Sequence, residues 1–208
     1  RSVAVRSWVY PGYYSAVGKP RAVTGSCPIL AGPGGCRTSI IMVAIGTSVG
    51  RDEIIDTRRL RLRRMHEDDR SSLVDMGWLD AERVMIRSVR TPWPWGFLAV
   101  TLDGSGEFCG ICGLLKQQLD HGDEVELAYH LRPRYHGRGL ATEAARGVME
   151  YAFANLDLRR IVSLIRPDNL PSRRVAEKNG LCHERDVVFH GDVHGMHVIL
   201  KQDWEIIR

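Results

Sequence analysis

Residues 125–153 read VELAYHLRPRYHGRGLATEAARGVMEYAF and change from one structural period to another within a single stretch. The first seven residues alternate between an apolar row and a row that carries Glu126, which predicts a β-strand with two different faces. From Leu140 onward, apolar residues recur every three or four positions, which predicts a long helix. Gly137 and Gly139 lie at the junction. The stretch therefore predicts a strand, a glycine loop and a helix, in that order.

The glycine loop RYHGRGLA, residues 134–141, has the features of an anion-binding site. Glycine lets backbone N–H groups turn outward without interference from a Cβ, and a helix N-terminus adds unpaired N–H groups and a positive dipole end. Arg134 and Arg138 can donate charge-assisted hydrogen bonds. A tight turn of small residues is the structural alternative. The loop lacks the Gly-Lys-Ser/Thr of a Walker A motif, and no GxGxxG follows an initial strand, so nucleotide hydrolysis and dinucleotide binding are disfavoured.

The sequence before this stretch predicts a strand, two short helices and a hairpin. In TRRLRLRRM (57–65), leucines alternate with arginines, as in an edge or half-buried strand. A first helix is expected to start at Asp68 and Asp69, and a second short helix is expected from Asp80 to about Ser88. Two further strands, GFLAVTL (96–102) and FCGICGLL (108–115), are joined by the turn LDGSGE, and KQQLDHGDE (116–124) is expected to be a polar loop.

The sequence after the long helix predicts a buried strand, a capped helix and two closing strands. RRIVSLI (159–165) is the buried strand, and the next helix begins at an Asn169 cap and ends at Gly180. The closing strands are DVVFH (186–190) and GMHVILK (195–201), joined at Gly191-Asp192.

The formal net charge is +4, from 29 Lys and Arg against 25 Asp and Glu. Residues 1–51 hold six of the basic residues and no acidic one, which leaves 23 basic against 25 acidic residues in the remainder. The main body is therefore slightly acidic and gives no electrostatic reason to expect nucleic-acid binding. A nucleic-acid-binding function, the third alternative, would have to use the basic front segment.

Residues 1–51 differ in composition from the rest of the chain, with frequent Gly and Pro and no sustained helical or strand period. We expect them to form a disordered extension or one that is not native to the protein, since Met42 could be the natural start. Residues 52–208 are expected to form one domain.

The five cysteines are scattered rather than regularly spaced, which favours a reducing, cytoplasmic compartment. Cys109 and Cys112 form a CxxC pattern inside a predicted strand, so buried thiols are expected rather than a redox pair. No apolar run is long enough for a membrane span. His190, His194 and His197 surround a turn without ligand spacing, so exposed histidines are expected and no metal site.

Three ordered segments together resemble a known family: TRRLRLRRMHEDD, VELAYHLRPRYHGRGLATEAARGVMEYAF and RPDNLPSRRVAEKNG. They resemble the GNAT acetyltransferases, and within that superfamily the RimJ/RimL group of ribosomal-protein N-acetyltransferases. The similarity covers about Asp56 to Trp204. It implies an α/β (α+β) fold with a central mixed, mostly antiparallel twisted sheet, a splayed strand pair and helices on both faces.

The resemblance implies acetyl-CoA as cosubstrate and an amine as acceptor, without a metal. The strand carrying Glu126 and the strand at 161–165 would splay apart and receive the pantetheine arm by strand addition. The pyrophosphate would lie on the glycine loop, and Asn169 and Ser172 would lie near the thioester. The implied cofactor-binding residues are Leu131, Arg132, Pro133, Arg134, Gly137, Arg138, Gly139, Leu140, Ala141, Thr142, Asn169 and Ser172.

The reaction needs a neutral amine, and an N-terminal α-amine with a pKa of about 7.7–8.0 meets this need with little base assistance. Glu126 is the candidate base, acting through water, with a purely structural carboxylate as an equal alternative. By resemblance Ser172 is the candidate proton donor to the CoA thiolate, with helix capping as the alternative. Tyr129 and His130 are candidates for the acceptor side, although core packing is the alternative for Tyr129.

One departure from the family lies between the second predicted helix and GFLAV, where relatives carry a longer helical segment that shapes the acceptor pocket. This departure motivates a second hypothesis, a non-catalytic GNAT-like module that binds CoA or a partner as a sensor or scaffold. The acceptor can be a protein N-terminus or a small amine, and a homodimer is left open.

Overall fold

The computed structural model describes residues 54–76 and 81–208, so the extension expected over residues 1–51 lies outside the described residues. The strands are β1 (Ile54–Asp56), β2 (Leu60–Arg64), β3 (Gly96–Leu102), β4 (Phe108–Leu119), β5 (Gly122–Leu131), β6 (Arg160–Ile165), β7 (Cys182–Phe189) and β8 (Asp192–Leu200). The helices are α1 (Arg70–Asp75), α2 (Ala81–Arg90), α3 (Leu140–Asn155), α4 (Leu170–Lys178) and α5 (Lys201–Ile207), with short 3-10 turns at Glu67–Asp69 and Pro133–Tyr135.

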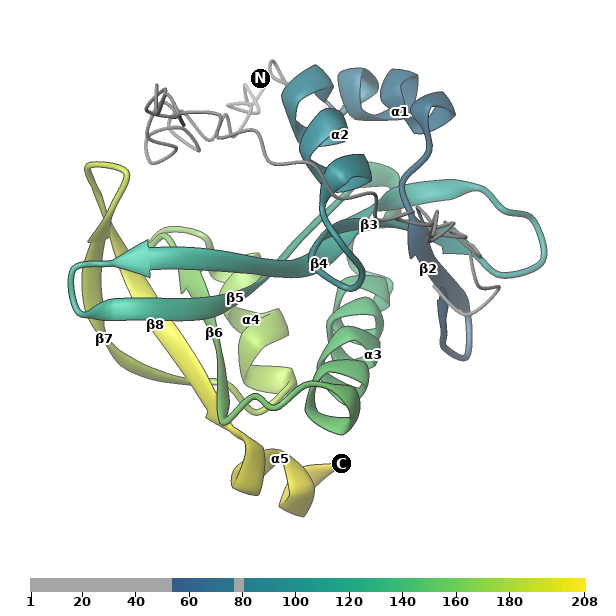
Figure 1. Cartoon of the computed structure of the whole chain (residues 1–208). Coiled ribbons are helices and arrows are strands. Elements are labelled where there is room, and N and C mark those ends of the chain that lie inside the picture. Colours follow the sequence, from purple (N-terminus) through teal and green to yellow (C-terminus); the bar gives the residue numbers. More distant parts are fainter. Residues whose placement is uncertain (1–53, 77–80) are drawn as a thin grey trace, which may run out of the picture.

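The described strands form one eight-stranded sheet in the order β1-β2-β3-β4-β5-β6-β8-β7 (Figure 1). Neighbouring strands are antiparallel except β5 and β6, which are parallel. A parallel pair needs a long crossover, and α3 supplies it. The mixed, mostly antiparallel sheet expected from the sequence is therefore confirmed.

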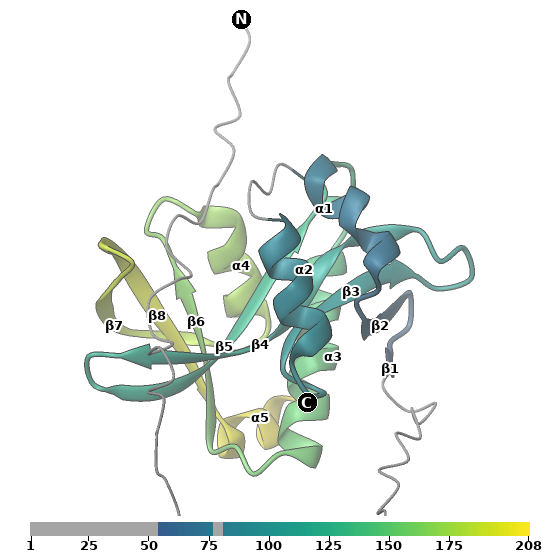
Figure 2. The same ribbon diagram turned by 45° about the horizontal axis from the view of Figure 1, so that its top comes forward.

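Helices cover both faces of the sheet, as expected. On one face, Leu140 and Val148 of α3 belong to the same buried cluster as Leu98 of β3 and Ala176 of α4. On the other face, Leu73 of α1 belongs to a separate cluster that includes residues of α2, β3 and β4. Successive strand residues point to opposite faces, which lets β3 contribute to both clusters. Figure 2 shows α1 and α2 in front of the sheet and α3 behind it. Among the described residues, no helix is both long and apolar enough to cross a membrane.

The parallel strands β5 and β6 meet at a single register pair, Glu126 with Val162. Next to this pair, the Ser163 hydroxyl donates to the carbonyl oxygen of Leu127 at 2.7 Å. The register contains no further β5–β6 pair among the described residues, so the strands diverge toward their C-terminal ends. This is the splayed pair expected from the resemblance, and we call the point where the strands meet the vertex.

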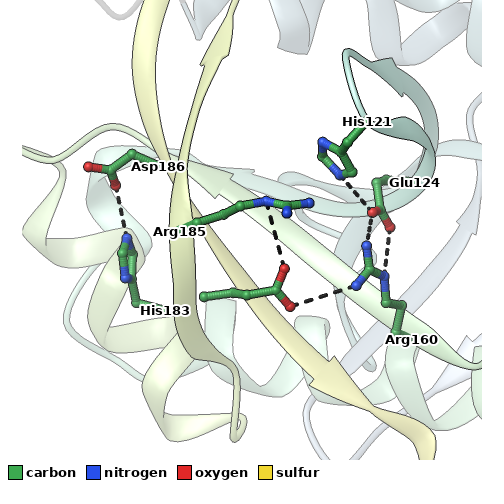
Figure 3. A network of polar contacts seen from close by, with 7 residues as sticks. His121, Glu124, Arg160, His183, Arg185 and Asp186 are labelled. Carbon is green, nitrogen blue, oxygen red and sulfur yellow. Dashed lines mark hydrogen bonds and ion pairs between the residues drawn. The ribbon is translucent and has the colours of Figure 1, made fainter.

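Side chains reinforce the vertex on the side away from the splay (Figure 3). Glu124 of β5 is buried and accepts two hydrogen bonds from the Arg160 guanidinium of β6, one of them from Nε at 3.0 Å. His121 Nε2 lies 3.0 Å from the same carboxylate, and Arg160 Nη1 lies 3.7 Å from Glu184 of β7. A side-chain network therefore connects β5 to β6 and β7 next to the one backbone register pair between β5 and β6.

The predicted polar loop over 116–124 is wrong. These residues continue β4 and start β5, with Lys116 opposite Val125 and a tight turn at Asp120 and His121. At the end of this hairpin, Leu119 packs in a third cluster with residues of β6, β7 and β8. The pattern misled the prediction because Lys116 and Gln118 are exposed on one face of the strand and Asp120 is exposed in the turn. The buried polar residues Gln117 and Glu124 have partners on other strands, as Glu124 has in Arg160.

The C-terminal region also differs from the prediction. The closing strands are longer than expected, and the turn between them is at His190 and Gly191, where both residues have positive φ. The sequence analysis did not predict α5, which buries Trp204 with its ring centroid 6.0 Å from that of Phe153. A helix of seven residues is too short to show a clear helical period.

We expect Trp204→Ala to lower the free energy of unfolding by about 3–5 kcal/mol, because it leaves a large cavity between α3 and α5. The matched control is Ile206→Ala in the same helix, whose side chain is 81% exposed and whose loss should change the free energy by no more than about 0.5 kcal/mol. Urea unfolding followed by circular dichroism measures both. Equal effects of the two substitutions would contradict the packing of α5.

A second expectation concerns Glu124. Burial alone would raise its pKa, but hydrogen bonds from Arg160 and His121 outweigh burial and hold the pKa below its ordinary value. The ionised carboxylate therefore contributes stability that is fully present above the unfolded pKa of about 4.3 and is lost as the pH falls through the folded pKa. Glu124→Gln should cost about 1–3 kcal/mol at pH 7.

The difference in unfolding free energy between the wild type and Glu124→Gln should shrink as the pH is lowered below about 4, since the wild-type carboxyl then becomes protonated. Glu184→Gln is the control, because its contact with Arg160 is longer and more exposed, and its effect should stay below about 1 kcal/mol. Urea titrations at neutral and acidic pH test this. A Glu124→Gln effect that is constant across the pH range would contradict the assigned ion pair.

Candidate functional site

A cavity of about 550 Å³ lies where β5 and β6 splay apart. Its lining comes from the end of β5, the glycine loop and first turn of α3, the start and one face of α4, and the β7–β8 turn. Tyr129, His130 and Leu131 are the β5 residues that line it. Because β6 has diverged from β5 here, this edge of β5 faces the cavity instead of a neighbouring strand.

The glycine loop forms one end of the cavity. Gly137 and Gly139 have φ values of 71° and 75°, in the left-handed region that residues with a Cβ rarely adopt. Gly139 is the N-cap of α3, so the N–H groups of Leu140, Ala141 and Thr142 belong to the first turn, where a helix provides no acceptors for them. All three residues line the cavity. The predicted anion cradle therefore has the required local geometry.

Most of the residues expected to bind the cofactor line this cavity. They are Leu131, Gly137, Gly139, Leu140, Ala141, Thr142, Asn169 and Ser172. Arg132, Pro133, Arg134 and Arg138 lie outside the lining. The glycine loop therefore lines the cavity, whereas the side chains of Arg132, Arg134 and Arg138 do not.

Arg132, Arg134 and Arg138, in and just before the glycine loop, have partners within the protein. Arg132 Nη2 lies 3.3 Å from the Ser72 carbonyl oxygen of α1, on the face of the sheet opposite α3. Arg134 forms a 2.8 Å ion pair with Glu107. The guanidinium carbons of Arg134 and Arg138 lie 5.0 and 5.8 Å from the centroid of the Tyr135 ring. Arg134 and Arg138 therefore stay beside the loop, whereas Arg132 does not.

Three cations that the sequence analysis missed line the cavity: Arg166, Arg174 and Lys178. Arg174 and Lys178 are four residues apart on α4 and so share a face of the helix. This spacing was a usable signal, because Asn169 and Ser172 had already placed the start of α4 at the site. Arg166 lies 3.2 Å from Asp192 of β8 and so connects the start of α4 with the β7–β8 turn.

The start of α4 is held by two hydrogen bonds. The Asn169 side chain accepts from the Ser172 N–H at 3.2 Å, which confirms Asn169 as the N-cap. The Tyr129 hydroxyl donates to the Ser172 carbonyl oxygen at 2.9 Å. Capping by the Ser172 side chain is therefore not what begins this helix, and Ser172 lies in the first turn against the cavity. Tyr129 lines the cavity and also packs against the core.

Glu126 is separated from Ser172. Its side chain is on the opposite strand face from Tyr129, is 2% exposed, and accepts a 2.5 Å hydrogen bond from Gln117 Nε2 of β4. Glu126 does not belong to the cavity lining, although it lies at the vertex from which the cavity opens. The structure therefore brings Ser172 into the cavity and leaves Glu126 behind its inner end.

Histidines contribute more to the cavity than expected. His130, His190 and His194 line it. Burial and the neighbouring His136 lower the pKa of His130, and burial and His194 lower the pKa of His190, so both imidazoles are neutral at pH 7. The prediction that the C-terminal histidines are exposed is wrong for His194 and His197, which are 4% and 3% exposed, because β8 lies between β6 and β7.

Within the described ranges, no group of three or more His, Cys, Asp and Glu side chains is arranged to hold a metal ion. Cys109 and Cys112 are buried in β4, as predicted from their place in a strand. Burial raises the pKa of both thiols, which is the opposite of what a reactive redox pair requires.

Comparison with known proteins places these features in a family. The sequence model of the acetyltransferase (GNAT) domain matches residues 59–181, more than half of the chain. YkkB of Bacillus subtilis (strain 168), described as an uncharacterized protein, is 37% identical over 83 residues, which are 40% of this chain and 48% of YkkB. The putative ribosomal N-acetyltransferase YdaF of the same organism is 33% identical over 110 residues, 48% of this chain and 57% of YdaF. The chain thus spans about half the length of these curated relatives.

Solved structures share the fold. An acetyltransferase from Agrobacterium tumefaciens str. C58 has a TM-score of 0.62 at 24% identity, over 70% of this chain and 93% of that chain. RimL, a ribosomal L7/L12 alpha-N-protein acetyltransferase in complex with coenzyme A, has a TM-score of 0.57 at 18% identity, over 73% of this chain and 98% of that chain. The family match and the shared fold show that this chain belongs to the GNAT acetyltransferase family.

Proposed function

We propose that this protein binds acetyl-CoA in the cavity and transfers the acetyl group to a primary amine. The observation that carries the proposal is the combination of two features in one cavity. One end presents the first-turn N–H groups of α3 behind two left-handed glycines, and one wall is the edge of β5 from which β6 has diverged. A diphosphate and a flexible arm with amide groups match these two features.

In this proposal the pyrophosphate of CoA lies on Gly137, Gly139 and the first turn of α3. Arg174 and Lys178 of α4 supply positive charge from the opposite wall. The pantetheine arm runs along residues 129–131 of β5, and the thioester reaches the region of Ser172. The site needs no metal, because amide N–H groups and cations stabilise the phosphates.

The chemistry is a direct transfer. The neutral amine attacks the thioester carbonyl, a C–N bond forms, and the C–S bond breaks with release of the CoA thiolate. Ser172 donates a proton to the thiolate and regains one from solvent. Glu126 accepts the amine proton through water, since it lies at the vertex behind the inner end of the cavity and not in its lining.

We place the protein in the RimJ/RimL group, as a cytoplasmic enzyme that acts on a protein N-terminal α-amine or a small amine. The names of YdaF and RimL support a ribosomal-protein substrate for those proteins. An α-amine is also the chemically easier acceptor here, because about a tenth of it is neutral at pH 7, so a base that acts only through water suffices.

A second candidate function is a CoA-binding sensor or scaffold without catalysis. The burial of Glu126 favours it, since the carboxylate is 2% exposed and already accepts a hydrogen bond from Gln117. This function requires the same cavity and the same cofactor, but no release of thiol.

Calorimetric titration with acetyl-CoA, compared between Gly137→Glu and the wild type, tests the cofactor site. The variant should bind roughly a hundredfold more weakly, because its carboxylate enters the cradle and repels the phosphates. Gly104→Glu is the matched control, since Gly104 also has positive φ and open space around a Cβ but lies in the β3–β4 turn. Equal affinities of the two variants would remove the glycine loop from the site.

Thiol release from acetyl-CoA, measured against a panel of small amines and Ser- or Ala-started peptides, tests the transfer step. Glu126→Gln and Ser172→Ala should each lower kcat by about 10²–10⁴-fold while the Kd for acetyl-CoA stays within about threefold of the wild type. Tight binding without thiol release by the wild type across the panel would favour the sensor. Unchanged kcat in both variants would overturn the assigned roles.

A further inference from the structure

A carboxylate lies beside the anion cradle. Glu143 is the acidic residue in the first turn of α3, and its side chain is 17% exposed. Burial alone would raise the pKa of this carboxyl, but hydrogen bonds from Thr57 and Arg59 outweigh burial and hold the pKa below its ordinary value. Glu143 is therefore ionised, and its charge has the sign that repels a phosphate.

Arg59, from the segment between β1 and β2, is paired with this carboxylate. Arg59 Nε donates to Glu143 Oε2 at 2.6 Å, and the Arg59 backbone N–H donates to Oε1 at 2.7 Å. The Thr57 hydroxyl donates to the same Oε1 at 2.8 Å. The carboxylate is thus surrounded by donors that lie more than 80 residues away in the sequence.

The same guanidinium also contacts the loop. Arg59 Nη1 donates to the Arg138 carbonyl oxygen at 3.1 Å, between the two left-handed glycines. Arg59 Nη2 lies 3.6 Å from the position that a Cβ on Gly139 would occupy. One cation therefore contacts both the first turn of α3 and the backbone of the glycine loop.

We propose that Arg59 is a positioning residue for the cofactor: it cancels the charge of Glu143 at the anion cradle and so permits a diphosphate to bind there. The inference rests on the proposed function, because the diphosphate is that of an acyl-CoA. Arg59 supplies the compensating charge that the loop arginines do not fully provide, since Arg134 is paired with Glu107.

Arg59 also has a structural role, since it holds the β1–β2 segment against α3, and the test must separate the two roles. If compensation of charge is what matters, removal of Arg59 leaves Glu143 as an unbalanced negative charge, and removal of Glu143 as well restores balance. If only attachment of the segment matters, the second substitution brings no recovery.

The test is calorimetric titration of the full chain with acetyl-CoA and with inorganic pyrophosphate, for the wild type, Arg59→Gln, Glu143→Gln and the double variant. Arg59→Gln should weaken binding of acetyl-CoA roughly tenfold. Glu143→Gln should bind as tightly as the wild type or more tightly, and the double variant should return to within about threefold of the wild type. The control is Arg61→Gln, because Arg61 also pairs with a carboxylate, that of Asp56, but does so within the β1–β2 hairpin and away from the loop; it should leave affinity unchanged.

Two results would overturn the inference and leave the proposed function standing: wild-type affinity in Arg59→Gln, or equally weak binding in Arg59→Gln and the double variant. A folded wild-type chain that binds neither acetyl-CoA nor pyrophosphate would overturn the anion cradle, and with it both the inference and the proposed function. Circular dichroism of each variant establishes that the fold is retained.

Discussion

The single backbone pair between β5 and β6 is the constraint on which the site depends. A parallel sheet normally continues its pairing along both strands, but here Glu126 and Val162 are the one register pair, and the cavity occupies the space that further pairs would fill. Because the backbone pairing is so short, side chains hold the strands together at the vertex. Arg160 bonds to Glu124 on one side of it, and the Ser163 hydroxyl bonds to the Leu127 carbonyl oxygen on the other. The end of β5 thereby lines the cavity while the sheet continues through β6.

Charge around the cavity is balanced rather than simply positive. Glycines and the first turn of α3 provide donors, but the same turn carries Glu143, and the loop residue Arg134 is paired with Glu107. The cations that line the cavity come from α4 and from Arg166 just before it, and the cation that compensates Glu143 comes from the segment before β2. An anion site of this kind is assembled from three parts of the chain, of which the glycine loop is one.

The local parts of this arrangement could be predicted from the sequence. The glycine loop, the α3 helix and the Asn169 cap depend on neighbours within a few residues, and the structure has each of them. Contacts between distant residues could not be predicted. The stretch 116–124 resembled a loop because exposed polar residues such as Lys116 and Gln118 alternate with Gln117, whose partner Glu126 is on another strand. The burial of Glu126 depends in turn on this distant contact with Gln117. Resemblance to a family likewise gave no sign that Arg132 points away from the cavity, toward α1.

The central claim is that an acyl-CoA occupies the space between the splayed strands and the N-terminus of α3. Hydrogen–deuterium exchange of the full chain, with and without saturating acetyl-CoA, tests it at the level of individual segments. We expect slower exchange of the amides in residues 137–142 and 129–131, because the cofactor would accept from the former and cover the latter. Binding of acetyl-CoA that slows exchange elsewhere and leaves both of these segments unchanged would contradict the claim.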